Sequence, residues 1–432
     1  MSSACGKIFW LWLLLAKSLP SSGATYSSEV RPILEKHCVQ CHRPGEVGPF
    51  ALDTFEAARK HAKQIALAAS TRFMPPWKPA PPSVAFHRER RLTLAEIATL
   101  QAWSVAGAPL GTGALVEAKA AAPTPVADRS WTMAQPFEVP AESQDLYRCF
   151  VIPSGLAQPA WIHGYEFVPG NRKVVHHALV FFDLSGAARK LDAEDPGPGY
   201  SCFGTPGFLP VASLGGWSPG NGPLTMPPGT AVRAPKGADV VIQIHYHATG
   251  KPETDQSKIN VFFAANAPER RLLDIALTSN RIDIPAGQAK YQVHDYFEVP
   301  VDVTLWQMIP HAHFVARRVR ASITPPGGRK RTVLWIPDWD FNWQDIYQLK
   351  VPLKLKAGTL LEMEIDYDNS AANPRNPNQP PQRVVWGPGT ADEMAGMHWN
   401  VTVDHEARDL EDLTSSLWGK MIRATQVTNR RR

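Results

Sequence analysis

From residue 137 to about residue 405, hydrophobic and polar residues alternate over short stretches, with the two-residue period of a β-strand. In the stretch 240–247, for example, apolar residues fall on one face, and the opposite face carries Gln243, His245 and His247. Gly, Pro and Asn residues separate these stretches, and helical periodicity is nearly absent. The pattern predicts an all-β region, and the length of this region favours two β-sandwich domains over one.

The preceding part of the chain, residues 25–112, has a helical period instead. Asp53 with Glu56, and Thr93 with Glu96, form capping-box-like starts for two helices. We therefore expect a small all-α domain in this part. The 40 prolines of the 432-residue chain disfavour long helices elsewhere and favour short strands joined by turns.

The predicted fold class is multidomain: a small all-α domain followed by two all-β sandwich (jelly-roll-like) domains. A chain of this length is too long for one ordinary core, which supports the division. The predicted parts are a signal peptide (1–24), a helical domain (25–112), an Ala/Pro-rich linker (113–135), a first β-sandwich domain (136–278), a second (279–407) and a tail with a short helix (408–432).

The first 24 residues have the features of a cleaved signal peptide. Lys7 precedes an apolar run at 8–16 that is too short to span a bilayer, and residues 22–24 (Ser-Gly-Ala) resemble a cleavage site. No other apolar run is long enough to span. We therefore expect a periplasmic or secreted protein without a transmembrane segment in the mature chain. The formal net charge of +5 is small for this length and gives no reason to expect a nucleic-acid partner.

The cysteines point to one covalent cofactor and one disulfide. Cleavage of the signal peptide removes Cys5 and leaves four cysteines: Cys38, Cys41, Cys149 and Cys202. Cys38 and Cys41 stand in a C-x-x-C-H haem-attachment motif that ends at His42. If both form thioethers, Cys149 and Cys202 remain as the only disulfide that can form, and an exported protein favours its formation.

This motif, together with the proline-rich loop at 72–77 (RFMPPW), resembles a class I c-type cytochrome. The resemblance implies a cytochrome c-like domain at 25–112 that carries one covalent haem c, with His42 as the proximal and Met74 as the distal iron ligand. A thioether opposite an imidazole suits electron transfer rather than oxygen binding. The alternatives are a zinc or redox C-x-x-C site, although neither the further zinc ligands nor a βαβ pattern is evident, and a core methionine at position 74.

Three groups of histidines occur in the predicted β region. His176 and His177 are adjacent, so a regular strand would turn them to opposite faces. Both can bind one metal only if the strand is bulged or one ring reaches with its nearer nitrogen. By itself this pair is more simply explained as one core and one surface residue. His311 and His313, by contrast, point to the same face of an extended segment, as two ligands of a transition metal would.

These groups and a late methionine occur in the order found in the copper type II ascorbate-dependent monooxygenases. The family has an HH pair, a Q-[VI]-H-Y histidine, an H-x-H pair and a D-E-M methionine, and this chain resembles it between residues 137 and 403. The resemblance implies an electron-transfer copper held by His176, His177 and His245. It implies a catalytic copper held by His311, His313 and Met394. It also implies a bridge between Cys149 and Cys202.

The softness of the predicted ligands supports copper, because a thioether with imidazoles favours a Cu(I)/Cu(II) couple over zinc. Met397 competes with Met394 as the methionine ligand, although the preceding Asp-Glu pair favours Met394. His247 and His398 are additional to the family pattern, and His247 shares a face with His245. The simplest alternative is a set of unrelated core and surface histidines, which the order of four motifs makes less attractive.

The resemblance implies hydroxylation of an activated C–H bond with molecular oxygen, on a small-molecule or peptide-like organic substrate. Relatives take single electrons from ascorbate, and we hypothesise that the attached haem supplies them here from an upstream donor that the sequence does not identify. One alternative function is non-enzymatic electron transfer or copper binding by a protein with a haem domain. Another is a secreted β-sandwich module whose histidines have no common role.

Overall fold

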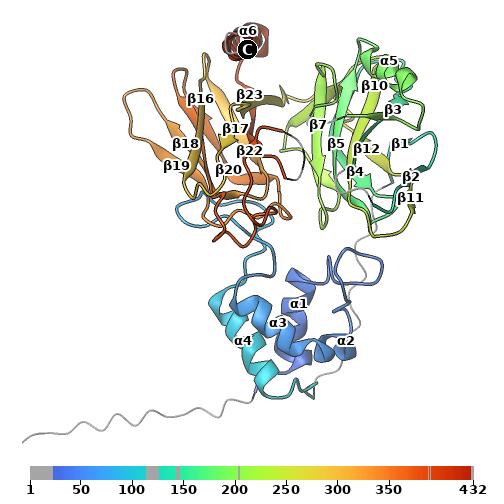
Figure 1. The fold of residues 1–432 in the computed structure, drawn as a ribbon, viewed down its shortest axis with the longest axis vertical. Helices are drawn as coiled ribbons and strands as arrows, with labels where there is room; N and C mark the ends of the chain where they lie inside the picture. The colour runs from blue at the N-terminus through green and yellow to red at the C-terminus, as the bar shows by residue number, and fades with distance from the viewer. Residues whose placement is uncertain are drawn as a thin grey trace, which may run out of the picture. The chain divides into compact units, whose positions relative to one another are not determined.

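The computed structural model describes residues 23–112, 126–142, 146–202, 205–387, 389 and 391–429, with the backbone alone for 421–429 (Figure 1). Almost all of the predicted signal peptide and the first half of the predicted linker lie outside these residues. The described residues divide into two compact units. None of the described helices combines the length and the apolar composition needed to cross a membrane.

The first unit is built from three segments, of which residues 23–44, 50–75 and 92–112 are described. A π-helical turn at Tyr26–Val30 leads into four short helices: α1 (Arg31–His37), α2 (Phe55–Lys60), α3 (Ala62–Ser70) and α4 (Leu94–Val105). The predicted capping box of Thr93 and Glu96 is present at the start of α4. At α2, however, the cap is Thr54, whose side chain accepts from the backbone of Ala57, so the predicted start was one residue early.

The second unit contains all 23 strands found among the described residues. A six-stranded sheet consists of β1 (Arg129–Thr132), β12 (Lys258–Phe263), β4 (Ala160–Val168), β9 (Thr230–Ala234), β13 (Arg270–Arg271) and β8 (Leu224–Thr225). A five-stranded sheet consists of β6 (Tyr200–Ser201), β3 (Leu146–Pro153), β10 (Asp239–Tyr246), β5 (Val175–Asp183) and β7 (Ala212–Trp217). These two sheets enclose one hydrophobic core, to which Ile162, Phe182 and Ile242 contribute.

Two four-stranded sheets enclose a second core, to which Leu305, Met363 and Trp399 contribute. One sheet consists of β14 (Leu273–Thr278), β23 (Ala395–Val403), β17 (Val303–Ala312) and β20 (Tyr347–Leu355). The other consists of β16 (Tyr291–Glu298), β21 (Leu360–Tyr367), β18 (Ala316–Thr324) and β19 (Arg331–Ile336). Two small pairs complete the strands: β2 (Phe137–Val139) with β11 (Glu253–Asp255), and β15 (Asp283–Ile284) with β22 (Val384–Val385).

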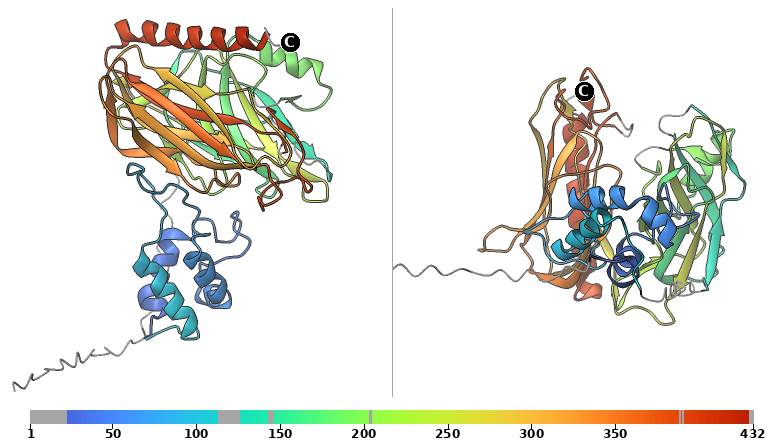
Figure 2. Two further views of the ribbon diagram at one scale, coloured as in Figure 1. Left: turned by 60° about the vertical axis from the view of Figure 1, so that its left-hand side comes forward. Right: turned by 90° about the horizontal axis from the view of Figure 1, so that it is seen from below.

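Two further helices belong to the second unit. Helix α5 (Ala187–Glu194) follows β5, and α6 (Glu406–Asn429) follows β23 and runs along one edge of the strands (Figure 2). Leu413 of α6 is fully buried in the second core, and Lys420 pairs with Asp295 at 2.6 Å between Nζ and Oδ1. The C-terminal helix is therefore longer than the predicted short one and is held to the strands along its first half.

The predicted fold class is wrong. The chain is mostly β, with four large sheets in a propeller-like arrangement within one compact unit, and no all-α cytochrome domain followed by two separate sandwich domains is evident. One physical reason is that residues 76–91, which lie inside the predicted helical domain, belong to the β unit. Phe86 forms a β-bridge with Leu349 and is 2% exposed, and the backbone N–H of Ala80 donates to Trp335. Non-local pairing of this kind leaves no periodic signal in the sequence.

The predicted disulfide is confirmed. Cys149 on β3 and Cys202 after β6 are bonded, with a sequence separation of 53 and a Cα–Cα distance of 5.7 Å. Cys149 is fully buried, and the small cluster around the bond includes Tyr200 and Val241. The bond ties β3, an inner strand of the five-stranded sheet, to the segment after α5.

Replacing both Cys149 and Cys202 by serine should destabilise the second unit. On the chain-entropy estimate, removing a cross-link with this sequence separation lowers the free energy of unfolding by roughly 4 kcal/mol. Urea unfolding of the variant and the wild type, followed by intrinsic tryptophan fluorescence, measures the difference. A change below about 1 kcal/mol would contradict a stabilising role for the bond.

Candidate functional site: two histidine clusters

The first histidine cluster is created by a β-bulge. Strand β10 pairs with β5 in regular antiparallel register until His245 meets His177, and the next pair is Tyr246 with Val175. His176 is therefore the extra residue of the bulge. A bulge re-aims side chains by breaking the alternation of a strand. Because of it, two adjacent histidines that a regular strand would turn apart face the same point.

Three nitrogen atoms converge in this cluster. The Nδ1 atoms of His176, His177 and His245 lie 3.2, 3.3 and 3.4 Å from one another, an almost equilateral triangle. A point equidistant from three atoms with a mean spacing of 3.3 Å lies about 1.9 Å from each, which is 3.3 Å divided by √3. That distance is close to the 2.0–2.1 Å typical of a bond between a divalent metal and an imidazole. The three residues therefore fit a bound metal ion.

Burial keeps two of these imidazoles, those of His177 and His245, neutral. It lowers the pKa of His177 well below the ordinary value, and the neighbouring His245 and His176 lower it further. Burial is also the main cause of the strongly lowered pKa of His245, which is completely buried. Neutral rings offer lone pairs, and three lone pairs aimed at one point repel each other unless a cation lies between them. The electrostatics of the cluster thus agree with its geometry.

Aromatic rings hold two of these imidazoles in place. Tyr147, the cross-strand neighbour of His245 on β3, stacks on it with ring centres 4.1 Å apart and planes at 6°. His176 stacks on His247, at 4.4 Å and 2°, and on Phe341, at 5.4 Å and 28°. Phe341 was not singled out by the sequence, since it is one of many aromatic residues without a motif.

The second histidine cluster lies at the end of β17. The rings of His311 and His313 are 5.3 Å apart and nearly perpendicular. Nδ1 of His311 contacts the side-chain oxygen of Gln344 at 2.5 Å, and Nδ1 of His313 contacts the backbone oxygen of Asp392 at 3.2 Å. Because both acceptors are oxygens, Nδ1 carries the proton in each ring and Nε2 is left as the metal-binding atom. Burial lowers the pKa of His311 to about 4, which favours the neutral ring.

Glu393 joins this histidine pair to the predicted methionine. Its carboxylate is completely buried and accepts backbone N–H groups from His313, Val315 and Met394, the last at 2.8 Å. Burial raises the pKa of Glu393 to about 8, although the N–H donors oppose the rise. Tyr367 adds a second anchor, because its hydroxyl donates to the backbone oxygen of Met394 at 2.8 Å. Two of the three predicted ligands, His313 and Met394, are thus tied through their backbone to one buried side chain.

The surroundings of the competing methionine and of the additional histidines indicate how each relates to the predicted ligands. Met397 on β23 is completely buried in the second hydrophobic core, which leaves the half-buried Met394 as the better candidate ligand. His398 forms an ion pair with Asp274 at 2.7 Å, and this carboxylate raises its pKa. His247, by contrast, contacts two rings of the first cluster.

A single connection between β19 and β20 touches both clusters. Phe341, which is 2% exposed, contacts His176 at 5.4 Å and His313 at 5.4 Å between ring centres. The imidazoles of His176 and His313 therefore lie no more than twice that distance apart. From the same connection Gln344 contacts His311, and its backbone oxygen accepts the hydroxyl of Ser218 at 2.7 Å. The two clusters are neighbours on the two sides of this connection.

The cysteine–histidine motif lies in the helical unit, directly after α1. Cys38 and Cys41 are both half-buried thiols, and burial raises the pKa of Cys38 to about 12. Nδ1 of His42 contacts the backbone oxygen of Phe50 at 3.0 Å, so its proton is on Nδ1 and Nε2 is available to iron. This arrangement fits a proximal haem ligand. Met74 follows α3, and its backbone N–H donates to Ala68; no contact in the structure tests its predicted role.

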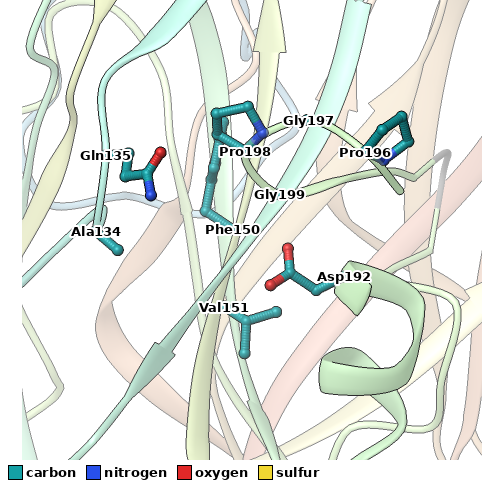
Figure 3. Close-up of a pocket in the computed structure, with 9 residues that line it drawn as sticks. All are labelled: Ala134, Gln135, Phe150, Val151, Asp192, Pro196, Gly197, Pro198 and Gly199. Atoms are coloured by element: carbon teal, nitrogen blue, oxygen red, sulfur yellow. The ribbon is translucent and has the colours of Figure 1, made fainter. Parts of the chain in front are cut away.

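A shallow cavity lies away from the histidines. Its accessible volume is about 300 Å³, and Phe150, Asp192 and the segment 196–199 contribute to its wall (Figure 3). Burial raises the pKa of Asp192. The wall contains neither a histidine nor a predicted ligand, so this cavity gives no support to any of the predicted chemistry.

Comparison with known proteins leaves the chain without an assigned family. No family of known proteins and no curated protein matches it. A structure of PNGF-II is similar over 64% of this chain and 65% of that one, slightly less than two thirds of its length, with 10% identity and a TM-score of 0.29. A subviral particle of VP2 from infectious bursal disease virus is similar over 68% and 76%, with 10% identity and a TM-score of 0.20. Such low scores carry no argument about fold or function.

Replacing Glu393 by glutamine should disturb the second cluster. The amide has one acceptor oxygen where the carboxylate has two, so at least one buried N–H of His313, Val315 or Met394 loses its acceptor. An unsatisfied buried donor costs roughly 1–3 kcal/mol of unfolding free energy. Chemical denaturation measures this loss, and Glu298→Gln at the exposed end of β16 serves as a control. Equal stability of Glu393→Gln and the wild type would contradict the proposed anchor.

Proposed function

We propose that this chain is an exported copper-dependent monooxygenase that hydroxylates an activated C–H bond with molecular oxygen and receives its electrons singly through an attached c-type haem. The observation that carries the proposal is the triangle of Nδ1 atoms in the first cluster. Three residues that the motif order matches to the copper family also converge in space, in an arrangement that fits a metal ion.

The first cluster would hold a copper through the Nδ1 atoms of His176, His177 and His245. The second would hold another through Nε2 of His311 and His313 and the thioether of Met394. Copper bound at these positions supplies one-electron redox chemistry and activation of dioxygen. Imidazoles alone would suit the first role, whereas the softer thioether distinguishes the second and favours the Cu(I) state there.

The surrounding residues have separate tasks in this proposal. Gln344 and the backbone of Asp392 fix the tautomers of His311 and His313, so that Nε2 is presented in both. Glu393 fixes the position of Met394 relative to His313. Phe341 is fully buried between the clusters and excludes water from the contact. The substrate would be a small-molecule or peptide-like compound, and no contact in the structure selects one chemical class.

Electron supply is assigned to the helical unit. Cys38 and Cys41 would form the thioethers of one haem c, and His42 and Met74 would be its axial ligands. The protonation of His42 at Nδ1 supports this assignment. The disulfide agrees with an oxidising compartment outside the cytoplasm, which is the compartment where haem c is attached and where the predicted signal peptide would direct the chain.

A second function is favoured by one observation. Among the described residues, only His176, His177 and His245 form a group of three histidine, cysteine or acidic side chains close enough to share a metal. One metal site and one haem would suit an electron-transfer or copper-binding protein without enzymatic activity. The two proposals differ in oxygen consumption.

The full chain purified after export should contain two copper ions and one haem, and should consume oxygen when given a reductant and candidate substrates. Met394→Leu removes the sulfur and keeps the side-chain size, so uptake should fall by about tenfold or more. Met397→Leu is the matched control, because a similar exchange in the core should cost little. Copper content and an oxygen electrode measure both effects. One haem with no copper, or copper without oxygen uptake, would contradict the monooxygenase proposal.

The haem assignment is tested by absorption spectroscopy. Cys38→Ala with Cys41→Ala should abolish covalent haem, seen as loss of the haem stain on a denaturing gel. Met74→Leu should keep the covalent haem but lose the sulfur-to-iron charge-transfer band and lower the reduction potential, because a thioether stabilises reduced iron. An unchanged band in Met74→Leu would exclude Met74 as the distal ligand.

A further inference from the structure

His176 is the residue of the first cluster whose direction the strand does not set. His177 and His245 are cross-strand neighbours, and the pairing of β5 with β10 fixes where each side chain leaves the sheet. His176 is the extra residue of the bulge, so the alternation of β5 would not by itself direct its ring to the metal. A metal site with precise geometry needs something else to hold that ring.

His247 is placed to do this. It follows β10 on the same face as His245, and its backbone N–H donates to Val174 at 2.8 Å, directly beside the bulge. Its ring lies flat on His176, with centres 4.4 Å apart and planes at 2°, and meets His245 edge-on at 4.9 Å and 86°. It is therefore as close to these two rings as the three cluster histidines are to one another, at 4.8 to 5.3 Å.

A second ring also lies against His176. Phe341, from the connection between β19 and β20, lies at 5.4 Å and 28°. The His176 ring thus contacts two planar rings, and rotation away from them would break both contacts. Stacked planar rings of this kind fix orientation without needing any particular nitrogen atom.

We propose that His247 is a positioning residue: its ring, together with Phe341, holds His176 so that Nδ1 completes the metal-binding triangle. In this proposal His247 supports the ring of His176 and is not a fourth ligand. Among the described residues, His176, His177 and His245 form the group close enough to share a metal. This inference rests on the proposed function, since it assumes that the first cluster binds copper.

The test distinguishes the contribution of the planar ring of His247 from that of its nitrogen atoms. Three variants are made in the full chain that carries His311→Ala, so that the first cluster is the copper site measured: His247→Phe, His247→Leu and His247→Ala. The affinity for Cu(I) is measured by competition with a chelator, and the Cu(II) form is examined by electron paramagnetic resonance. His294→Ala is the control, because His294 stacks on Tyr296 outside the cluster.

His247→Phe should bind copper within about threefold of the parent and keep its nitrogen hyperfine pattern. His247→Leu and His247→Ala should bind roughly 10- to 100-fold more weakly, as is common when the support of a metal ligand is lost, and should show a broadened spectrum. If His247→Phe were as weak as His247→Ala, the nitrogen would be required and His247 would be a ligand. If all three variants bound like the parent, the stack would have no positioning role. Either result would overturn the proposal.

Folding and the underlying assumption are checked separately. Thermal unfolding of the metal-free variants shows whether a loss of affinity is only a loss of structure, and the leucine variant covers the case in which alanine does not fold. Absence of copper from the His311→Ala parent would overturn the first copper site itself, and with it both proposals. If the His311→Ala parent binds copper but the His247 variants do not behave as expected, the positioning role is wrong and the first copper site still stands.

Discussion

The antiparallel pairing of β5 with β10, and the single bulge in it, is the constraint on which the candidate site depends. The pairing brings His177 opposite His245, and the bulge adds His176 to the same point. Both strands are mostly apolar and lie inside the five-stranded sheet, and all 8 residues of β10 are buried, so packing on its two faces fixes the register. The strength of that register is what allows an irregularity to be held at one position.

The second cluster is organised by a different device. There a buried carboxylate, Glu393, gathers the backbone of the H-x-H segment and of the D-E-M segment around one side chain. Backbone N–H groups cannot be left unpaired in a dry interior, and the carboxylate satisfies several of them at once. The D-E-M motif thus has a physical meaning here: the glutamate ties the backbone of Met394 to that of His313.

The connection between β19 and β20 relates the two clusters. Its Phe341 contacts a histidine of each, and its Gln344 contacts the second cluster while accepting a hydrogen bond from Ser218 beside the first sheet pair. Rings in contact across one aromatic side chain are also electrostatically coupled, and His311 and His313 contribute to the lowered pKa of His177 and of His245. In the proposed enzyme, the charge at one metal site would therefore affect the other.

The sequence by itself determined the local features: the β character of residues 137–405, the capping box at Thr93, the pair Cys149–Cys202, and the identity of the histidines that meet at the first cluster. These follow from short-range periodicity, from counting and from motif order. The tertiary structure alone decided the arrangement of the sheets and the packing of residues 76–91 against the β unit. It also decided the bulge at His176 and the contacts that Phe341, Gln344 and Glu393 make with the clusters. Each of these depends on contacts between residues far apart in the chain, where no periodic pattern records the partner.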